Sequence, residues 1–168
     1  MTPFACSIAG WPRSARVSSL VLAALVCAST STLGQGGPPS IAVVVGHNMT
    51  SSEPVSPTLV LGMFAKKRVF WSDHSAVVAV NLAASNPLRR AFSLSVFKKT
   101  PEQLQDYWND QYFHGVLPPP VLGSEEAVLR FVASTRGAVG YVSACSVDKR
   151  VDVIALIQVA EGPAACAP

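Results

Sequence analysis

The sequence contains few of the residue patterns that mark an enzyme or a metal protein. His47, His74 and His114 are scattered, and none has a second histidine, a cysteine pair or a carboxylate at a metal-ligand spacing. A nucleophile elbow, a Cys/His constellation and a glycine-rich phosphate loop are also absent. We therefore predict a protein that is not an enzyme, holds no metal and needs no cofactor.

Long apolar runs are equally scarce, with one exception near the N-terminus. Residues 1–16 carry only Arg13 and Arg16 as charges, an apolar run follows over 17–28, and small and polar residues come next. This order is typical of a secretory signal peptide, and the run is too short for a confident membrane span. We predict a signal peptide over 1–34, and a retained N-terminal anchor is the alternative.

Charge is sparse and nearly balanced in the rest of the chain. The whole sequence has 13 Lys and Arg against 10 Asp and Glu, and Arg13 and Arg16 leave with the signal peptide, so the mature net charge falls to about +1. That balance is too even for a nucleic-acid binder. We expect residues 35–168 to form one exported domain without a stable membrane span and without a nucleic-acid partner.

Cysteine is also rare. Cys6 and Cys27 lie in the expected signal peptide, which leaves Cys145 and Cys166 as a pair in an oxidising compartment. A disulfide between them is predicted, with two free thiols as the alternative. If the two strands before these cysteines pair antiparallel, the C-terminal segment must retrace most of a strand, which predicts a strained closure.

What the sequence does contain is an alternation of strands and helices. The continuous β-branched run at 41–45 predicts a strand that is buried on both faces. Further strands are expected at 77–82, 121–122, 138–142 and 151–159, and helices at 57–66, 87–97, after a capping box at 100–103, and at 125–134. This order predicts an α/β fold with a mixed sheet flanked by helices.

The stretch 77–92 is the predicted centre of the molecule, because a strand runs there into a polar turn and a helix. Ser85 and Asn86 lie in the turn, and Arg89 lies in the first helical turn, where the helix dipole disfavours positive charge unless an anion is bound. Ser124 begins another helix. We predict Ser85, Asn86, Arg89 and Ser124 as anion contacts. The alternative is that each polar side chain only caps its own helix and that Arg89 lies on a solvated face.

Three stretches resemble the substrate-binding proteins of phosphate ABC transporters, which have the type 2 periplasmic-binding-protein fold. Residues 63–66 and 71–73 match a family helix that ends in a phenylalanine-containing stretch and a Trp-Asp turn, and 135–142 matches a TPGAIGYV strand entry. The remaining stretch, 76–92, contains the polar turn with Ser85 and Asn86 before the central helix. The resemblance covers most of 41–160. It implies one periplasmic-binding-protein-like lobe, with the second lobe reduced to 41–70 and the C-terminal strand.

The chain departs from this family in two respects. Where family members have Ser-Gly-Thr before the central helix, this chain has Ser85-Asn86-Pro87, so only Ser85 carries over. The mature chain, at about 130 residues, is also far shorter than a two-lobed binding protein. The resemblance implies a periplasmic solute-binding-like module that binds phosphate or a similar oxyanion weakly. The alternative is a module that keeps the fold, has lost the ligand and docks on an envelope protein such as a sensor or receptor.

Overall fold

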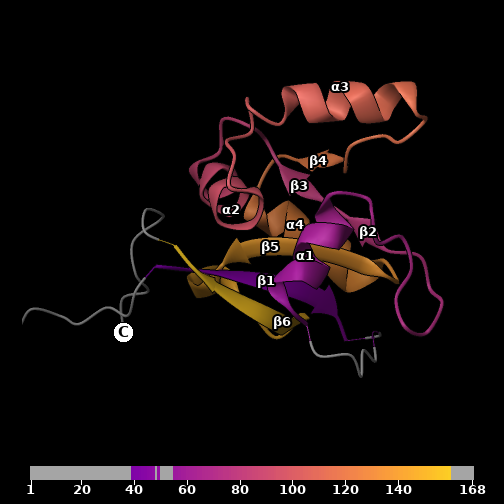
Figure 1. Cartoon of the computed structure of the whole chain (residues 1–168). Coiled ribbons are helices and arrows are strands. Elements are labelled where there is room, and N and C mark those ends of the chain that lie inside the picture. Colours follow the sequence, from indigo (N-terminus) through magenta and orange to yellow (C-terminus); the bar gives the residue numbers. More distant parts are fainter. Residues whose placement is uncertain (1–38, 48, 50–54, 160–168) are drawn as a thin grey trace, which may run out of the picture. The chain divides into compact units, whose positions relative to one another are not determined.

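The computed structural model describes residues 39–47, 49 and 55–159, which belong to a single compact unit (Figure 1). Four strands form a mixed sheet in the order β2-β5-β1-β6, and two more form a small parallel sheet, β3-β4. The strands are β1 (Ser40–Gly46), β2 (Val78–Ala79), β3 (Asn81–Leu82), β4 (Val121–Leu122), β5 (Ala138–Ser143) and β6 (Val151–Gln158). The helices are α1 (Pro57–Phe64), α2 (Pro87–Phe97), α3 (Gln105–Phe113) and α4 (Glu125–Ser134), with a 3-10 turn, η1 (Ala144–Ser146). The predicted mixed α/β architecture is confirmed.

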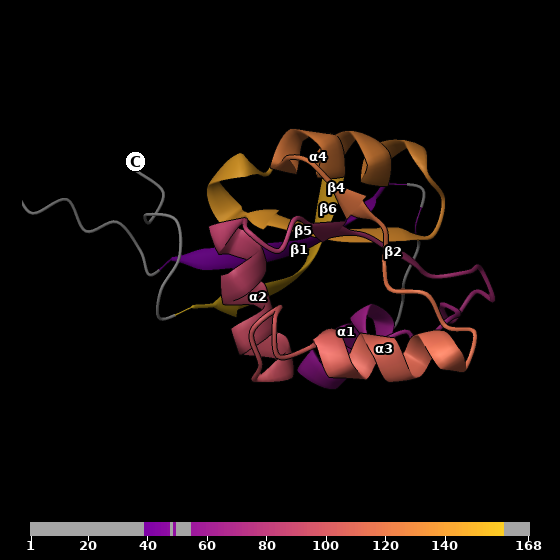
Figure 2. The same cartoon turned by 90° about the horizontal axis from the view of Figure 1, so that it is seen from above.

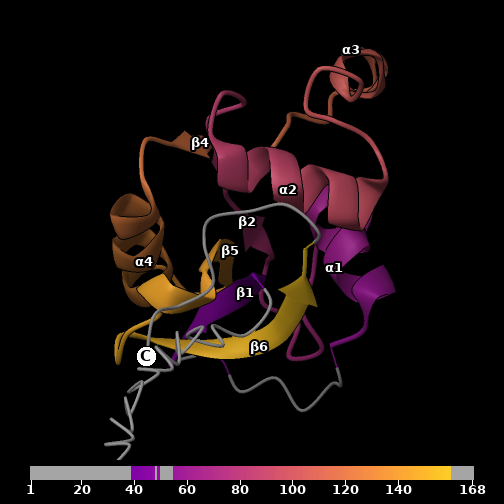
Figure 3. The same cartoon turned by 90° about the vertical axis from the view of Figure 1, so that its left-hand side faces the viewer.

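Helices cover both faces of the larger sheet. α4 lies on one face, and α1 and α2 lie on the other (Figures 2 and 3). On the α4 side, Gly140 of β5 allows close approach, because a Cβ there would lie 2.5 Å from Cγ1 of Val128. On the other side, the ring of Phe92 stacks on Tyr141 of β5 with ring centroids 3.9 Å apart. β5 is thus held between two helix layers.

β1 occupies the middle of the sheet. It pairs antiparallel with β5 on one side and with β6 on the other. Residues Ile41 to Val45 are 0–2% exposed, as a continuous apolar run predicts for a strand covered on both faces. α1, β1 and β6 therefore belong to the same layered body as the other elements. The segments that the resemblance assigned to a reduced second lobe do not form a separate lobe in the described part of the chain.

The single strand expected over 77–82 is instead two short strands in different sheets. The N–H of Val80 donates to the carbonyl of Val139 on β5, at 3.0 Å, whereas the N–H of Asn81 donates to the carbonyl of Pro120, at 2.8 Å. The chain changes partner between these two residues. Pro120 can accept a hydrogen bond through its carbonyl, but it has no N–H with which to donate one to another strand.

β5 and β6 do not pair with each other. Both run antiparallel to β1, so they are parallel to one another and end at the same edge, with Ser143 opposite Ile41 and Gln158 opposite Ser40. The antiparallel pairing on which the strained disulfide depended is therefore wrong. Cys145 lies two residues beyond β5, at the edge where β6 ends.

Two helices are shorter than the sequence indicated. α1 ends at Phe64, and Lys66 follows with a left-handed backbone, φ 59°. The capping box forms, since the N–H of Thr100 donates to Oε1 of Gln103 at 2.9 Å, and the N–H of Gln103 donates to Oγ1 of Thr100 at 3.3 Å. A turn intervenes before α3 begins. No helix in the described ranges is long and apolar enough to cross a membrane.

Candidate functional site

Two helices begin on the side of the molecule where the parallel strands β3 and β4 end. β3 and β4 pair in parallel, with Leu82 opposite Leu122, so the residues that follow them leave from the same side. Tyr141 joins β5 to this arrangement, because its hydroxyl accepts the N–H of Leu82 at 3.3 Å. α2 follows β3 and α4 follows β4. The carboxyl ends of strands in open α/β sheets are common ligand sites.

The start of α2 carries no acidic residue. Asn86 is the N-cap, and its Oδ1 accepts the N–H of Leu88 at 2.8 Å. Pro87 holds the first helical position, where its missing N–H costs nothing. Ser85 lies exposed in the preceding turn. The positive end of the α2 dipole is therefore not offset by any carboxylate of its own first turn.

Arg89 lies in the first turn of α2 and is buried. Only 8% of its surface is exposed, and its Nε and Nη1 atoms are buried without a hydrogen-bond partner. Burial lowers the pKa of the guanidinium, an effect that the nearby Tyr141 hydroxyl opposes. The group still keeps its charge at neutral pH. The expectation of a solvated Arg89 is therefore wrong, whereas Arg90 is exposed and lies 3.6 Å from Glu102.

Tyr141, which interacts electrostatically with Arg89, forms a buried polar pair with Asn81. The hydroxyl of Tyr141 donates to Oδ1 of Asn81 at 3.3 Å, and both residues are buried. Burial raises the pKa of Tyr141 to about 12, although the Arg89 charge and the Leu82 N–H oppose that rise. Tyr141 therefore stays neutral at physiological pH, and the charge of Arg89 has no anionic side chain to pair with among the described residues.

The start of α4 is occupied by groups of its own chain. Ser124 is the N-cap, and its Oγ accepts the N–H of Ala127 at 3.1 Å. Oε2 of Glu125 accepts the backbone N–H of Ser143, at the end of β5, at 2.7 Å. Glu126 forms an ion pair with Arg150 at 2.7 Å. The Ala127 N–H at this helix start is therefore capped, and two carboxylates lie in the first turn, where the helix dipole favours them.

The four predicted contacts fall into two groups. Ser85, Asn86 and Arg89 lie together at the start of α2, and Ser124 begins α4 at the same edge. Their role as ligand contacts stays a prediction. The sequence reasoning missed Asn81 and Tyr141, although each is a polar residue inside a short apolar strand, a pattern that could have identified them. It also missed the Glu125 carboxylate.

Two predictions concern residues that lie wholly or partly outside the described ranges. The signal peptide over 1–34 and its boundary with the 35–168 domain are outside them, and so is Cys166. Cys145 lies in η1, next to the end of β5. The signal peptide and the disulfide therefore stay predictions.

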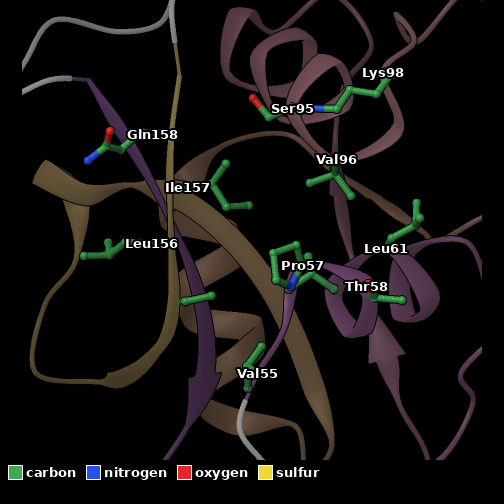
Figure 4. A pocket seen from close by; sticks show the side chains of 12 residues that line it. Val55, Pro57, Thr58, Leu61, Ser95, Val96, Lys98, Leu156, Ile157 and Gln158 are labelled. Atoms are coloured by element: carbon green, nitrogen blue, oxygen red, sulfur yellow. The ribbon is translucent and has the colours of Figure 1, made fainter.

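A pocket of about 610 Å³ lies elsewhere, between α1, the C-terminal half of α2 and the end of β6 (Figure 4). Its lining is mostly apolar and includes Leu61, Val96 and Ile157, with Lys98 as the charged residue. Arg89 does not line it. Within the described ranges, no group of three or more His, Cys, Asp or Glu residues is placed to hold a metal ion.

Comparison with known proteins relates this fold to solved structures only. No protein-family model matches the chain, and no curated protein matches it. Among solved structures, it is similar to a phosphate ABC transporter substrate-binding protein with bound phosphate from Clostridium perfringens, with a TM-score of 0.56 and 18% identity over 69% of this chain and 44% of that one. It is also similar to an ABC-type phosphate transport receptor from Vibrio cholerae, with a TM-score of 0.54 and 23% identity over 69% and 45%.

A third solved structure has the same relationship. PstS from Borrelia burgdorferi aligns with a TM-score of 0.53 and 12% identity, over 75% of this chain and 49% of that protein. The chain thus spans less than half the length of each of these three proteins. The match shows a periplasmic-binding-protein-like fold at the scale of a single lobe.

Proposed function

We propose that the protein is a periplasmic, non-catalytic solute-binding-like module that binds phosphate or a similar oxyanion weakly. The observation that carries this proposal is Arg89, a buried cation whose Nε and Nη1 have no partner within the described protein. An unpaired charge held away from water is costly, and an anion beside it offsets that cost. The bound phosphate in the Clostridium perfringens protein supports the choice of ligand.

The start of α2 supplies the other donors. Ser85, which is exposed, and the side-chain amide of Asn86 lie at this helix start, together with the positive end of the helix dipole, which favours an anion. Ser124 is the proposed contact from α4, where its hydroxyl can donate while its oxygen caps the helix. Affinity is weak because a single lobe leaves one side of the anion in water.

Calorimetry and thermal melting with phosphate and sulfate test this proposal. The wild-type melting temperature should rise with anion concentration as RT ln(1 + [L]/Kd) requires. Arg89→Gln should lose both the heat and the rise. Arg90→Gln removes a neighbouring but exposed charge and should keep them. Folded wild-type protein that gives no heat and no rise at millimolar anion would overturn oxyanion binding.

A second candidate function is docking on an envelope protein without a ligand. It is favoured by α3, which has no buried residue, and by Tyr112 and Phe113, which are 61% and 85% exposed. Leu117 and Val121, which follow α3 in the chain, are also exposed, at 63% and 61%. A flat melting response to anions, together with retention of an envelope protein that Phe113→Ser abolishes, would favour this function over the first.

The disulfide and the export of the chain belong to the same proposal. β5 and β6 end at one edge with only β1 between them, a separation of about 10 Å by strand spacing. The seven steps from Val159 to Cys166 reach at most about 25 Å, so a bond to Cys145 needs no retracing of β6. Mass spectrometry of the unreduced exported protein tests both points, since two alkylatable thiols or an intact leader would contradict them.

A further inference from the structure

Glu125 differs from the other acidic residue in the first turn of α4. Glu126 is neutralised by Arg150 and Arg130, at 2.7 Å and 3.4 Å. Glu125 instead accepts the neutral backbone N–H of Ser143, and no ion pair to it is found in the described ranges. Its negative charge is therefore hydrogen-bonded but not compensated by a cation.

Glu125 begins the helix that follows β4, and the proposed anion site lies at the start of the helix that follows the paired strand β3. Leu82 and Leu122 are paired neighbours, α2 begins five residues after Leu82, and Glu125 comes three residues after Leu122. The N–H that Glu125 holds belongs to Ser143, two residues beyond Tyr141, whose hydroxyl contacts Leu82. The carboxylate and the start of α2 thus belong to one cluster of strand ends.

We propose that Glu125 is the residue that sets the charge selectivity of the anion site and disfavours dianions, an inference that rests on the proposed function. The carboxylate accepts the Ser143 N–H and places a negative charge in the first turn of α4. This charge repels an anion that binds at the start of α2. Coulomb energy is proportional to the ligand charge, so the penalty on a dianion is twice that on a monoanion. The factor by which the carboxylate lowers the affinity for a dianion is then the square of the factor for a monoanion.

The test compares two tetrahedral probes of similar size, dianionic sulfate and monoanionic methanesulfonate, by calorimetry at low ionic strength. Glu125→Gln removes the charge but keeps an amide oxygen that can accept the Ser143 N–H. We expect its affinity for methanesulfonate to rise about threefold and that for sulfate about tenfold, because the second factor is the square of the first. Low salt is needed because screening weakens both effects.

Two control variants separate a local charge effect from other causes. Asp106→Asn makes the same change in net charge on exposed α3 and should alter neither affinity by more than the error. Glu125→Asp keeps the charge and should leave the ratio of the two affinities unchanged, so a changed ratio there would contradict a charge effect. Glu125→Ala also removes the charge and should change the ratio as Glu125→Gln does, which covers the case in which Glu125→Gln does not fold.

The failures of the two proposals are distinguishable. Wild-type binding that needs Arg89, combined with equal changes for both probes or no change in Glu125→Gln, would overturn the role of Glu125 and leave oxyanion binding standing. A folded wild type and a folded Glu125→Gln that bind neither probe would overturn both proposals.

Discussion

α2 and α4 begin at the same edge of the molecule, yet their first turns are built in opposite ways. α4 has two acidic residues there, and its Glu125 and Glu126 carboxylates hold a backbone N–H and an arginine. α2 has no acidic residue in its first turn and instead carries Arg89, buried and without a partner for two of its nitrogens. The first turn of α4 therefore carries negative charge that the helix dipole favours, whereas the first turn of α2 carries a buried positive charge that it disfavours.

This difference between the two helix starts shows that the chain tolerates an unfavourable placement of charge at the start of α2. Burying an unpaired guanidinium opposes folding, and placing it at the positive end of a helix adds a smaller cost. α4 demonstrates that this same fold can supply carboxylates to a helix start at this edge. The lack of one at α2 is therefore a feature of this site and not a necessity of the architecture, and it supports our proposal that the start of α2 contributes most to an anion site.

The largest expected change in stability comes from removing the packing of α2 against β5 without altering α4. Phe92 is fully buried, stacks on Tyr141 and contacts the edge of Phe64, with ring centroids 4.7 Å apart. Phe92→Ala should lower the free energy of unfolding by about 3–5 kcal/mol because it leaves a cavity. Urea denaturation measures this change. Leu94→Ala, at a position that is 40% exposed on the same helix, is the control and should lose much less.

The next effect concerns the uncompensated charge itself. Arg89→Met in anion-free buffer should raise the free energy of unfolding by about 1–2 kcal/mol, since it replaces a buried unpaired cation with an apolar side chain of similar length. At saturating phosphate the wild type should recover this difference. Arg90→Met, at the exposed neighbouring position, should change stability little in either buffer. A large loss of stability in Arg89→Met without anion would show that Arg89 is a structural residue.

A smaller effect is expected when α2 is given an acid, as α4 has. Asn86→Asp keeps the capping oxygen and adds a negative charge beside the helix dipole and Arg89, which should stabilise the anion-free protein by about 0.3–1 kcal/mol. The same carboxylate should compete with phosphate and reduce the melting response. Ser124→Asp adds an acid to a start that already has two, so its gain should be smaller. Equal gains at both positions would contradict the contrast between the helices.

The smallest effect is a pH dependence on the α4 side. Hydrogen bonds from Arg150 hold the pKa of Glu126 below its ordinary value of 4.5. Its contribution to stability is therefore complete above that value and is lost as the pH falls through the lowered pKa of the folded state. The stability difference between wild type and Glu126→Gln should be constant near pH 7 and vanish below the lowered pKa. A difference that persisted in strong acid would indicate another cause.

Local signals were sufficient for much of the fold. α2 and α4 begin at the residues that the asparagine, proline and serine start signals indicate, and the apolar runs of β1 and β6 are strands. The change of partner between Val80 and Asn81 was not predictable, because it depends on which distant carbonyl lies opposite each N–H. The place of β1 between β5 and β6 was missed for the same reason, since strand order is a property of the whole chain.

The site was predictable in its chemistry but not in its burial. A polar turn before a proline-started helix identified Ser85, Asn86 and Arg89, which do lie together. Nothing local distinguishes Arg89 from Arg90, although one is buried and the other is exposed. The difference follows from the rotation of α2 on the sheet, which Phe92 and Tyr141 set. The contact of Glu125 with Ser143 joins residues 18 positions apart and was equally hidden.

The central position of β1 also determines the order in which the molecule can form. This strand comes first among the described elements, but its neighbours are β5 and β6, so Ile41 must wait for Ser143 and Ile157, more than a hundred residues later. Such distant pairings are slow to form because a long loop must close first. Before the last strand has been synthesised, β1 cannot obtain both partners, and the sheet stays incomplete. For a chain that we propose is exported, this delay keeps it unfolded until nearly all of it is available, after which the sheet can close in one cooperative step.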